Sequence, residues 1–119
     1  MKRKDIRKWD TKWSKAVKIK AKERCEYCGA TGKYLQSHHW FGRRHFVTRF
    51  DVSNGSCLCA GCHFKAEQNS LVMAQWIIKK RGKKWYDELQ GLSEKLAKDC
   101  PDIIGSCLDE IEEVLDEIR

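Results

Sequence analysis

The sequence predicts a small α+β fold that is mostly helical. Two short segments with strand-like composition, at 33–37 and 56–58, lie among closely spaced cysteines and histidines, and four longer segments repeat apolar residues every three or four positions. The second period is that of an amphipathic helix. At 119 residues the chain is expected to form one domain. We divide it into a basic helical arm at 1–24, a cysteine-rich core at 25–69 and a helical extension at 70–119.

The apolar content and the net charge of the chain indicate how large its core is, which partners it binds and where in the cell it is found. Hydrophobic residues make up 41% of the chain, so its core is small and is expected to need a staple such as a metal. The net charge of +7 favours DNA or another polyanion, although a merely soluble basic protein has the same charge. No apolar run of about 18 residues is present, and the charged N-terminal segment lacks the apolar stretch of a secretory signal. A cytoplasmic, reducing location is therefore expected.

The first 24 residues carry 11 Lys or Arg against three acidic residues. Trp9, Trp13, Ala16 and Val17 recur at helical spacing, which predicts a basic helix from about 10 to 22 with its tryptophan face packed inward. This helix is expected either to contact a DNA backbone or to present an ordinary solvated face.

The middle of the chain predicts a compact hairpin between two turns. Cys25 and Cys28 form a knuckle, and the next residue, Gly29, supplies the backbone freedom that the turn needs. Residues 33–37 read as a strand, 40–50 as a basic loop, Asn54-Gly55 as a turn and 56–58 as the returning strand. A helix from about residue 60 then carries two polar side chains at i and i+4, His63 and Glu67.

Three further helical stripes follow, at 71–78, 85–96 and 103–118. Gly82 stops the first and Pro101 ends the second. The basic run at 79–84 is expected to touch DNA or to complement a helix dipole. The last stripe is very regular and its opposite face is acidic, with seven acidic residues and one basic residue from 102 to 119. It is expected to fold back on the core, to pair with a second protomer or partner protein, or to screen the basic surface.

Cysteine spacing predicts a structural zinc site. Cys25, Cys28, Cys59 and Cys62 form two Cys-x-x-Cys pairs, and each such turn presents two thiolates to a tetrahedral ion. The alternatives are a redox dithiol, buried free thiols, or replacement of Cys59 by Cys57. The remaining cysteines are expected to be ordinary buried thiols: Cys57, Cys100 and Cys107.

Histidines cluster between these cysteine pairs. A short hairpin would bring together His38, His39, Asn54 and His63. Phosphodiester hydrolysis needs a metal to stabilise charge and a base of near-neutral pKa to activate water. Because neighbouring strand residues point to opposite faces, His38 and His39 are expected to do different jobs. Taken one by one, however, His38 and His39 could be surface residues, and His63 could be a zinc ligand together with three cysteines.

In these residues the sequence resembles the HNH endonucleases, which have a ββα-metal (His-Me finger) core. The likeness covers about 24–69 and rests on Cys25-x-x-Cys28, His38-His39, Asn54 and Leu58-Cys59-x-x-Cys62-His63. The resemblance implies that His39 is the general base, that His38 and His63 bind the catalytic ion, and that Asn54 orients the hairpin and the base through hydrogen bonds. Glu67 stands where many members have a further histidine. A carboxylate there suits a hard ion such as Mg²⁺ or Mn²⁺, and Ni²⁺ is a third candidate.

A narrower likeness lies in the basic loop. Phe41-Gly-Arg-Arg-His45, followed by Thr48-Arg49-Phe50-Asp51-x-x-Asn54, resembles phage recombination nucleases of the Rap/NinG type, which act on branched DNA. His38 and His63 depart from that group and are closer to general HNH enzymes. A phage or mobile-element origin, with action in the host cell, would follow from this likeness.

Arginines in the same loop are expected to clamp phosphates beside the catalytic ion, namely Arg43, Arg44 and Arg49, unless the loop is merely solvated. His45 is expected to touch DNA or solvent and not metal. The sequence thus predicts a divalent-metal-dependent DNA endonuclease with a structural zinc. The alternative is a zinc-dependent nucleic-acid-binding module without catalysis.

Overall fold

A computed structural model describes residues 1–32 and 34–118 of the protein. The described chain is α+β and mostly helical, as predicted, with a single antiparallel hairpin. In chain order its elements are α1 (Arg3–Lys20), β1 (Leu35–His39), α2 (Phe46–Arg49), a 3₁₀ turn (Val52–Asn54), β2 (Gly55–Cys59), α3 (Ala60–Gln68), α4 (Ser70–Arg81), α5 (Lys83–Ser93), a second 3₁₀ turn (Ala97–Asp99) and α6 (Pro101–Asp116).

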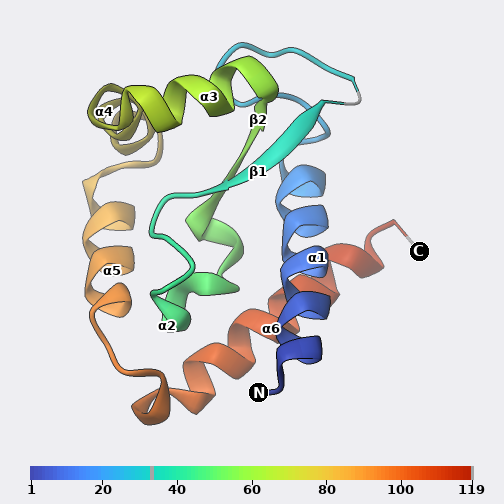
Figure 1. Ribbon diagram of the computed structural model, residues 1–119, viewed down its shortest axis with the longest axis vertical. Helices are drawn as coiled ribbons and strands as arrows, with labels where there is room; N and C mark the ends of the chain where they lie inside the picture. The colour runs from blue at the N-terminus through green and yellow to red at the C-terminus, as the bar shows by residue number, and fades with distance from the viewer. Residues whose placement is uncertain (33, 119) are drawn as a thin grey trace.

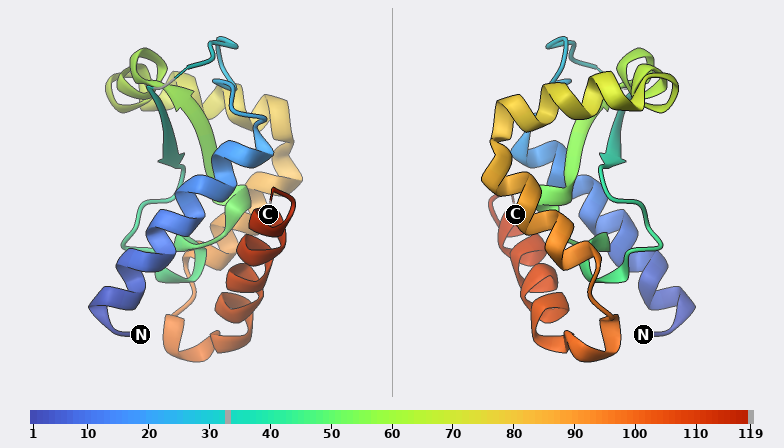
Figure 2. Two further views of the ribbon diagram at one scale, coloured as in Figure 1. Left: turned by 90° about the vertical axis from the view of Figure 1, so that its right-hand side faces the viewer. Right: turned by 90° about the vertical axis from the view of Figure 1, so that its left-hand side faces the viewer.

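The β1–β2 hairpin lies at the centre of the molecule (Figure 1). Helices α3 and α4 lie across one end of it, α1 and α6 cross on one side, and α5 stands on the other. The two views in Figure 2 show the same order, with α6 lying against α1. Across the described residues no helix combines the length and apolar character needed to cross a membrane.

Two apolar clusters hold the hairpin from its two faces. Cys57 of β2 joins a cluster with Trp13 of α1 and Ile111 of α6. The next residue, Leu58, points the other way into a second cluster with Ala66 of α3 and Met73 of α4. Because strand side chains alternate between faces, two neighbouring residues of one strand take part in both clusters. A two-stranded hairpin is barely stable alone in water, so this double support fixes its place.

Helix α6 folds back on the chain, which was one of the three outcomes expected for it. Its apolar stripe is buried against the core through Cys107, Ile111, Val114 and Leu115. The acidic face meets the basic helix α1, where Lys12 pairs with Glu112 and Lys20 Nζ lies 3.8 Å from Glu110 Oε1. The stripe that suggested a dimer or a partner protein is therefore already covered within the chain.

The hairpin turn was predicted wrongly. Asn54 ends a 3₁₀ turn, and Gly55 is the first residue of β2, with an extended backbone at φ −123°. Gly55 pairs with His39, and a Cβ atom built on it would lie 2.6 Å from Trp13 Cζ2 and 2.6 Å from Val17 Cγ2. The glycine is needed because α1 packs onto the strand and not because a tight turn forms there.

Several element boundaries also differ from the prediction. Helix α1 begins at Arg3, seven residues before the expected start near residue 10, because Ile6 and Trp9 extend the apolar face of Trp13 and pack against the same core cluster. The basic loop contains α2, whose Val47 and Thr48 are buried. Helix α5 ends at Ser93, which leaves Leu96 60% exposed, and Pro101 begins α6. The predicted strand 33–37 shifts to Leu35–His39, and its first residue, 33, lies outside the described residues.

Candidate functional site

The four cysteines of the predicted zinc site come together at one end of the hairpin. Cys25 and Cys28 sit in a turn that Gly29 closes at φ +80°, Cys59 ends β2, and Cys62 lies in the first turn of α3. Their Sγ atoms all lie within 4.8 Å of one another, and Cys28 Sγ is 3.7 Å from Cys59 Sγ. Four thiolates around a tetrahedral zinc lie about 3.8 Å apart, given a Zn–S bond of about 2.3 Å. The donor set and its spacing fit a zinc ion.

Local hydrogen bonds favour the thiolate form of Cys25. Burial alone would raise the pKa of this thiol, but hydrogen bonds from the backbone of Cys28, Cys59 and Tyr27 outweigh it and lower the pKa to about 6. A thiolate that is available near neutral pH is what a metal needs, since metals compete with protons for sulfur.

The other three cysteines lie outside this cluster, as predicted. Cys57, Cys100 and Cys107 are all buried. Burial raises the pKa of Cys57 to about 11 and that of Cys107 to about 12, which makes both thiols poor nucleophiles. Cys57 packs into the cluster on the α1 side of the hairpin, so Cys59 and not Cys57 completes the four-cysteine group.

His38 and His63 face each other on the α3 side of the hairpin. Their ring centroids are 5.2 Å apart, and His63 Nε2 lies 3.6 Å from Glu67 Oε1 one turn along α3. Burial lowers the pKa of His38 to about 4, helped by the neighbouring imidazoles of His63 and His39. A neutral imidazole can bind metal. Among the described residues, however, only the four cysteines have three or more ligand atoms gathered closely enough to hold an ion as they stand.

His39 points to the opposite face, as strand alternation predicts. Its ring stacks on Trp13 of α1, with ring centroids 3.6 Å apart and planes within 9°. His39 Nε2 lies 2.9 Å from the carbonyl oxygen of Arg49. A carbonyl can only accept, so Nε2 carries the proton and Nδ1 is the unprotonated nitrogen of the neutral ring. Burial lowers the pKa of His39 to about 4, so the ring is neutral at pH 7.

Asn54 is fully buried and clamps the loop that follows β1. Its Nδ2 donates to the carbonyls of Phe41 at 2.8 Å and Thr48 at 3.0 Å, and its Oδ1 accepts from the Phe41 N–H at 2.8 Å. Thr48 directly precedes Arg49, whose carbonyl holds His39. Asn54 thus acts on His39 through the loop and not by contact.

The three arginines of the loop have different surroundings. Arg49 is bound to Asp10 of α1 through two hydrogen bonds, Nε–Oδ1 at 3.0 Å and Nη2–Oδ2 at 2.7 Å. Its guanidinium therefore already has a partner, and the predicted phosphate contact would have to displace Asp10. Arg44 and Arg43 are exposed, and Arg44 Nε donates to His45 Nε2 at 3.3 Å. His45 in turn donates from Nδ1 to the carbonyl of Ser93 at 3.2 Å, so its ring has a structural role.

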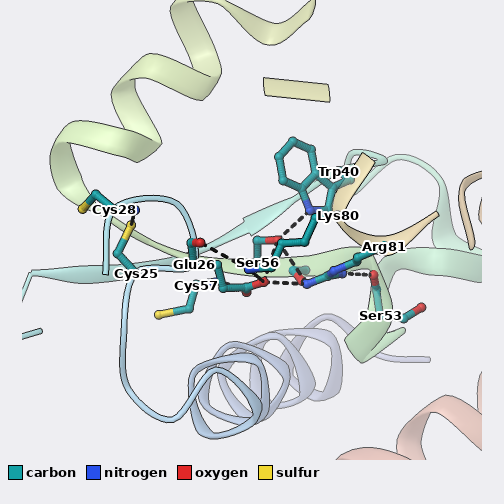
Figure 3. A network of polar contacts seen from close by, with 10 residues as sticks. Cys25, Glu26, Cys28, Trp40, Ser53, Ser56, Cys57, Lys80 and Arg81 are labelled. Atoms are coloured by element: carbon teal, nitrogen blue, oxygen red, sulfur yellow. Dashed lines mark hydrogen bonds and ion pairs between the residues drawn. The ribbon is translucent and has the colours of Figure 1, made fainter. Parts of the chain in front are cut away.

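A half-buried polar network that the sequence did not reveal lies beside the hairpin (Figure 3). Glu26, between the first two cysteines, accepts from the Cys57 N–H at 2.7 Å and from Arg81 Nη2 at 2.9 Å. Arg81 also donates to the carbonyls of Ser53 and Gly55, at 2.7 and 2.8 Å. The guanidinium of this member of the basic run at 79–84 is therefore bound within the protein.

The same network reaches the strand residue opposite His38. Ser56, which pairs with His38 in the hairpin register, accepts from Trp40 Nε1 at 2.9 Å and from Arg81 Nη2 at 3.2 Å. These hydrogen bonds connect the cysteine turn, the end of α4 and β2, the strand that pairs with His38. No spacing rule connects Glu26 with Arg81, because the two are 55 residues apart.

Compared with protein-family models, curated proteins and solved structures, the chain has no significant match.

Proposed function

We propose that this protein is a divalent-metal-dependent DNA endonuclease of the HNH type, with a ββα-metal core formed by β1, β2 and α3. The observation that carries the proposal is the state of His39. It is a neutral imidazole whose Nε2–H is fixed by the Arg49 carbonyl, which leaves Nδ1 as the proton acceptor. A general base must be unprotonated at the working pH and held in one orientation, and it is strongest when its pKa lies near that pH. The pKa of His39, at about 4, meets the first need, and the negative charge of a bound phosphate would raise it toward the near-neutral value expected of the base.

His38, His63 and Glu67 supply the second part of the proposal. They lie on the α3 face of the same hairpin, and they offer two imidazoles and a carboxylate. A bound divalent ion such as Mg²⁺, Mn²⁺ or Ni²⁺ would stabilise negative charge on the phosphate and the leaving oxygen. Glu67 is exposed, so its carboxylate could turn toward an ion held by the two imidazoles.

In this mechanism the base and the ligands have separate supports. His39 takes a proton from the attacking water, while Trp13 and the Arg49 carbonyl keep its ring in place. By the family resemblance, the products carry 5′-phosphate and 3′-hydroxyl ends. Branched recombination DNA of a phage or mobile element is the substrate that the loop resemblance suggests.

A second candidate is a nucleic-acid-binding module that uses the four-cysteine metal site for folding and has no catalysis. It is favoured by the packing of His39 against Trp13 and by the absence, in the described part of the chain, of a preformed metal group at the histidines. In this alternative the histidines have a purely structural role.

Cleavage by a matched set of variants separates the two candidates. His39→Ala removes the base, and His39→Phe removes it while keeping a ring to stack on Trp13. Both should lose cleavage of linear, supercoiled, single-stranded and four-way-junction DNA with each candidate ion, while DNA binding is retained. His45→Ala, which removes an imidazole bound to Ser93, should still cleave. Undiminished cleavage by folded His39→Phe would rule out the assignment, and no cleavage by the parent protein would favour the binding module.

A further inference from the structure

A hollow of about 500 Å³ runs along helix α1 on the side of the molecule where His39 lies. One wall is the stripe of α1 that carries Arg7, Asp10, Thr11, Ser14, Lys15 and Lys18, and Arg43 of the basic loop forms the other wall. The α1 residues recur every three or four positions, so they share one face of the helix. From Arg7 to Lys18 this face is about 16 Å long at 1.5 Å per residue. We call it the α1 groove.

The charge of the α1 groove is almost entirely positive. It contains four cations and one acid, Asp10. Both oxygens of that carboxylate are taken by Arg49, which neutralises it. Within the described residues, no ion pair involves Arg7, Lys15, Lys18 or Arg43.

Two other cations of the same helix, Lys12 and Lys20, do form ion pairs. Lys12 and Lys20 face α6 and pair with Glu112 and Glu110. The acidic helix therefore balances the charge on one side of α1 and leaves the groove side uncompensated. Clustered like charges repel one another in the folded protein and attract ligands of opposite charge, so a row of cations that lines a hollow favours an anionic partner.

The α1 groove is connected to His39 by short contacts. Ser37 Oγ donates to the Ser14 carbonyl at 2.7 Å, which ties β1 to the groove wall. Arg49 Nη1 donates to the Arg43 carbonyl at 3.5 Å, and the Arg49 carbonyl accepts from His39. A strand of DNA lying in the groove would thus lie along the helix against which His39 stacks, through Trp13.

We propose that the α1 groove binds the sugar–phosphate backbone of the DNA strand that is presented to His39. This inference deepens the proposed function and depends on it for the role of His39. The occupant follows from the chemistry of the lining. Cations stand at both ends of the stripe, Arg7 at one and Lys15 and Lys18 at the other, with the hydroxyl side chains of Thr11 and Ser14 between them. Such a lining suits a chain of phosphates, and it contains no apolar residue against which a base would stack. The groove therefore orients DNA without reading its sequence.

The test compares two double variants of α1 that remove the same charge. The groove variant is Arg7→Gln with Lys15→Gln. The control is Lys4→Gln with Lys8→Gln, which changes two exposed lysines of the same helix that do not line the groove. All four side chains are exposed, so both proteins should fold normally. Binding of a fluorescein-labelled duplex is measured by anisotropy from 50 to 300 mM NaCl, without added divalent ion.

The groove variant should bind the duplex at least tenfold more weakly than the parent protein at about 100 mM salt. The plot of log affinity against log salt concentration should also become shallower by about 1–2, since each phosphate contact contributes about 0.9 to the slope. The control should change affinity less than about threefold. Equal losses in both variants, or no loss in the groove variant, would overturn the inference. Cleavage is scored separately with Mg²⁺ or Mn²⁺. If binding depends on the groove but no cleavage is seen, the proposed nuclease activity is rejected and the groove proposal stands. If the parent protein and the groove variant cleave equally well, the groove proposal is rejected and the nuclease activity stands.

Discussion

Replacing Asn54 with aspartate should release the loop that holds His39. The change is almost isosteric, but it exchanges the Nδ2 amide for a second carboxylate oxygen. That oxygen would face the carbonyls of Phe41 and Thr48, which now accept hydrogen bonds of 2.8 and 3.0 Å. The bond from the Phe41 N–H to Oδ1, at 2.8 Å, can persist. The variant therefore tests the two donated bonds and little else.

The expected loss follows from burial. Asn54 is 0% exposed, so no solvent replaces the lost donors. The Phe41 carbonyl would be left without a partner, at a cost of about 1–3 kcal/mol, whereas the Thr48 carbonyl would keep its bond from the Asp51 N–H at 3.1 Å. Burial of the new carboxyl group adds about 1–3 kcal/mol. Some relaxation of the loop is expected, so the free energy of unfolding should fall by about 3 kcal/mol. In a chain of this size that corresponds to a melting temperature lower by about 10–15 °C.

The loss should also depend on pH. Burial against two carbonyls disfavours the ionised form, so the new carboxyl group has a higher pKa in the folded than in the unfolded protein. The folded state then binds more protons, and stability falls as pH rises above about 4, the unfolded value. The deficit relative to the parent protein should therefore be smaller at pH 5 than at pH 8.

Urea unfolding with zinc and a reductant measures the change, and Asn69→Asp is the matched control. Asn69 is exposed and its side chain makes no capping hydrogen bond, so its replacement should alter stability by less than about 0.5 kcal/mol. The reasoning would be refuted if Asn54→Asp cost less than about 1 kcal/mol, or no more than the control. The cleavage rate, where cleavage is present, should fall as the loop loosens, since the Arg49 carbonyl would no longer hold His39.

Two further predictions concern the supports of the hairpin. Gly55→Ala should destabilise the protein by about 1–3 kcal/mol, because its Cβ would overlap Trp13 and Val17. Gly91→Ala in α5 is the control, since its Cβ would have nothing within 4 Å, and it should be neutral or stabilising by up to about 1 kcal/mol. Thermal melts of the two variants measure these changes of opposite sign. Chelation of the metal should abolish hydrogen-exchange protection in α3 and α4, whose cluster includes Cys25 and Cys62, while protection in α6 outlasts it. Equal protection in all three helices after chelation would contradict the second prediction.

The features that the sequence predicted are those encoded by local spacing. The two Cys-x-x-Cys turns, the helix carrying His63 and Glu67, and the apolar stripe of α6 all follow from periods of a few residues. Burial of the three remaining cysteines was also predicted, from composition and from the place of Cys107 on a stripe. Each of these inferences needs only neighbours in the chain.

The features that were missed depend on partners far apart in the sequence. The prediction that Arg49 contacts phosphate did not include its pairing with Asp10, 39 residues away, which depends on how α1 crosses the loop. Gly55 was predicted to be a turn residue because the sequence does not show that Trp13 of α1 packs against it. Local patterns give the type of a residue and its element, but they do not report which helix will pack against it.

The arrangement around β2 explains why the supports of His39 should act together. The four-cysteine group fixes the Cys59 end of β2, and Gly55 at the other end lies against Trp13. Trp13 also stacks on His39 and donates from Nε1 to the Asp51 carbonyl at 2.8 Å, three residues before Asn54. A shift of β2 would therefore move the stacking platform and the clamped loop in one step. On this reasoning, removal of a metal ion bound by the four cysteines should disturb His39 through packing, without any contact between the two sites.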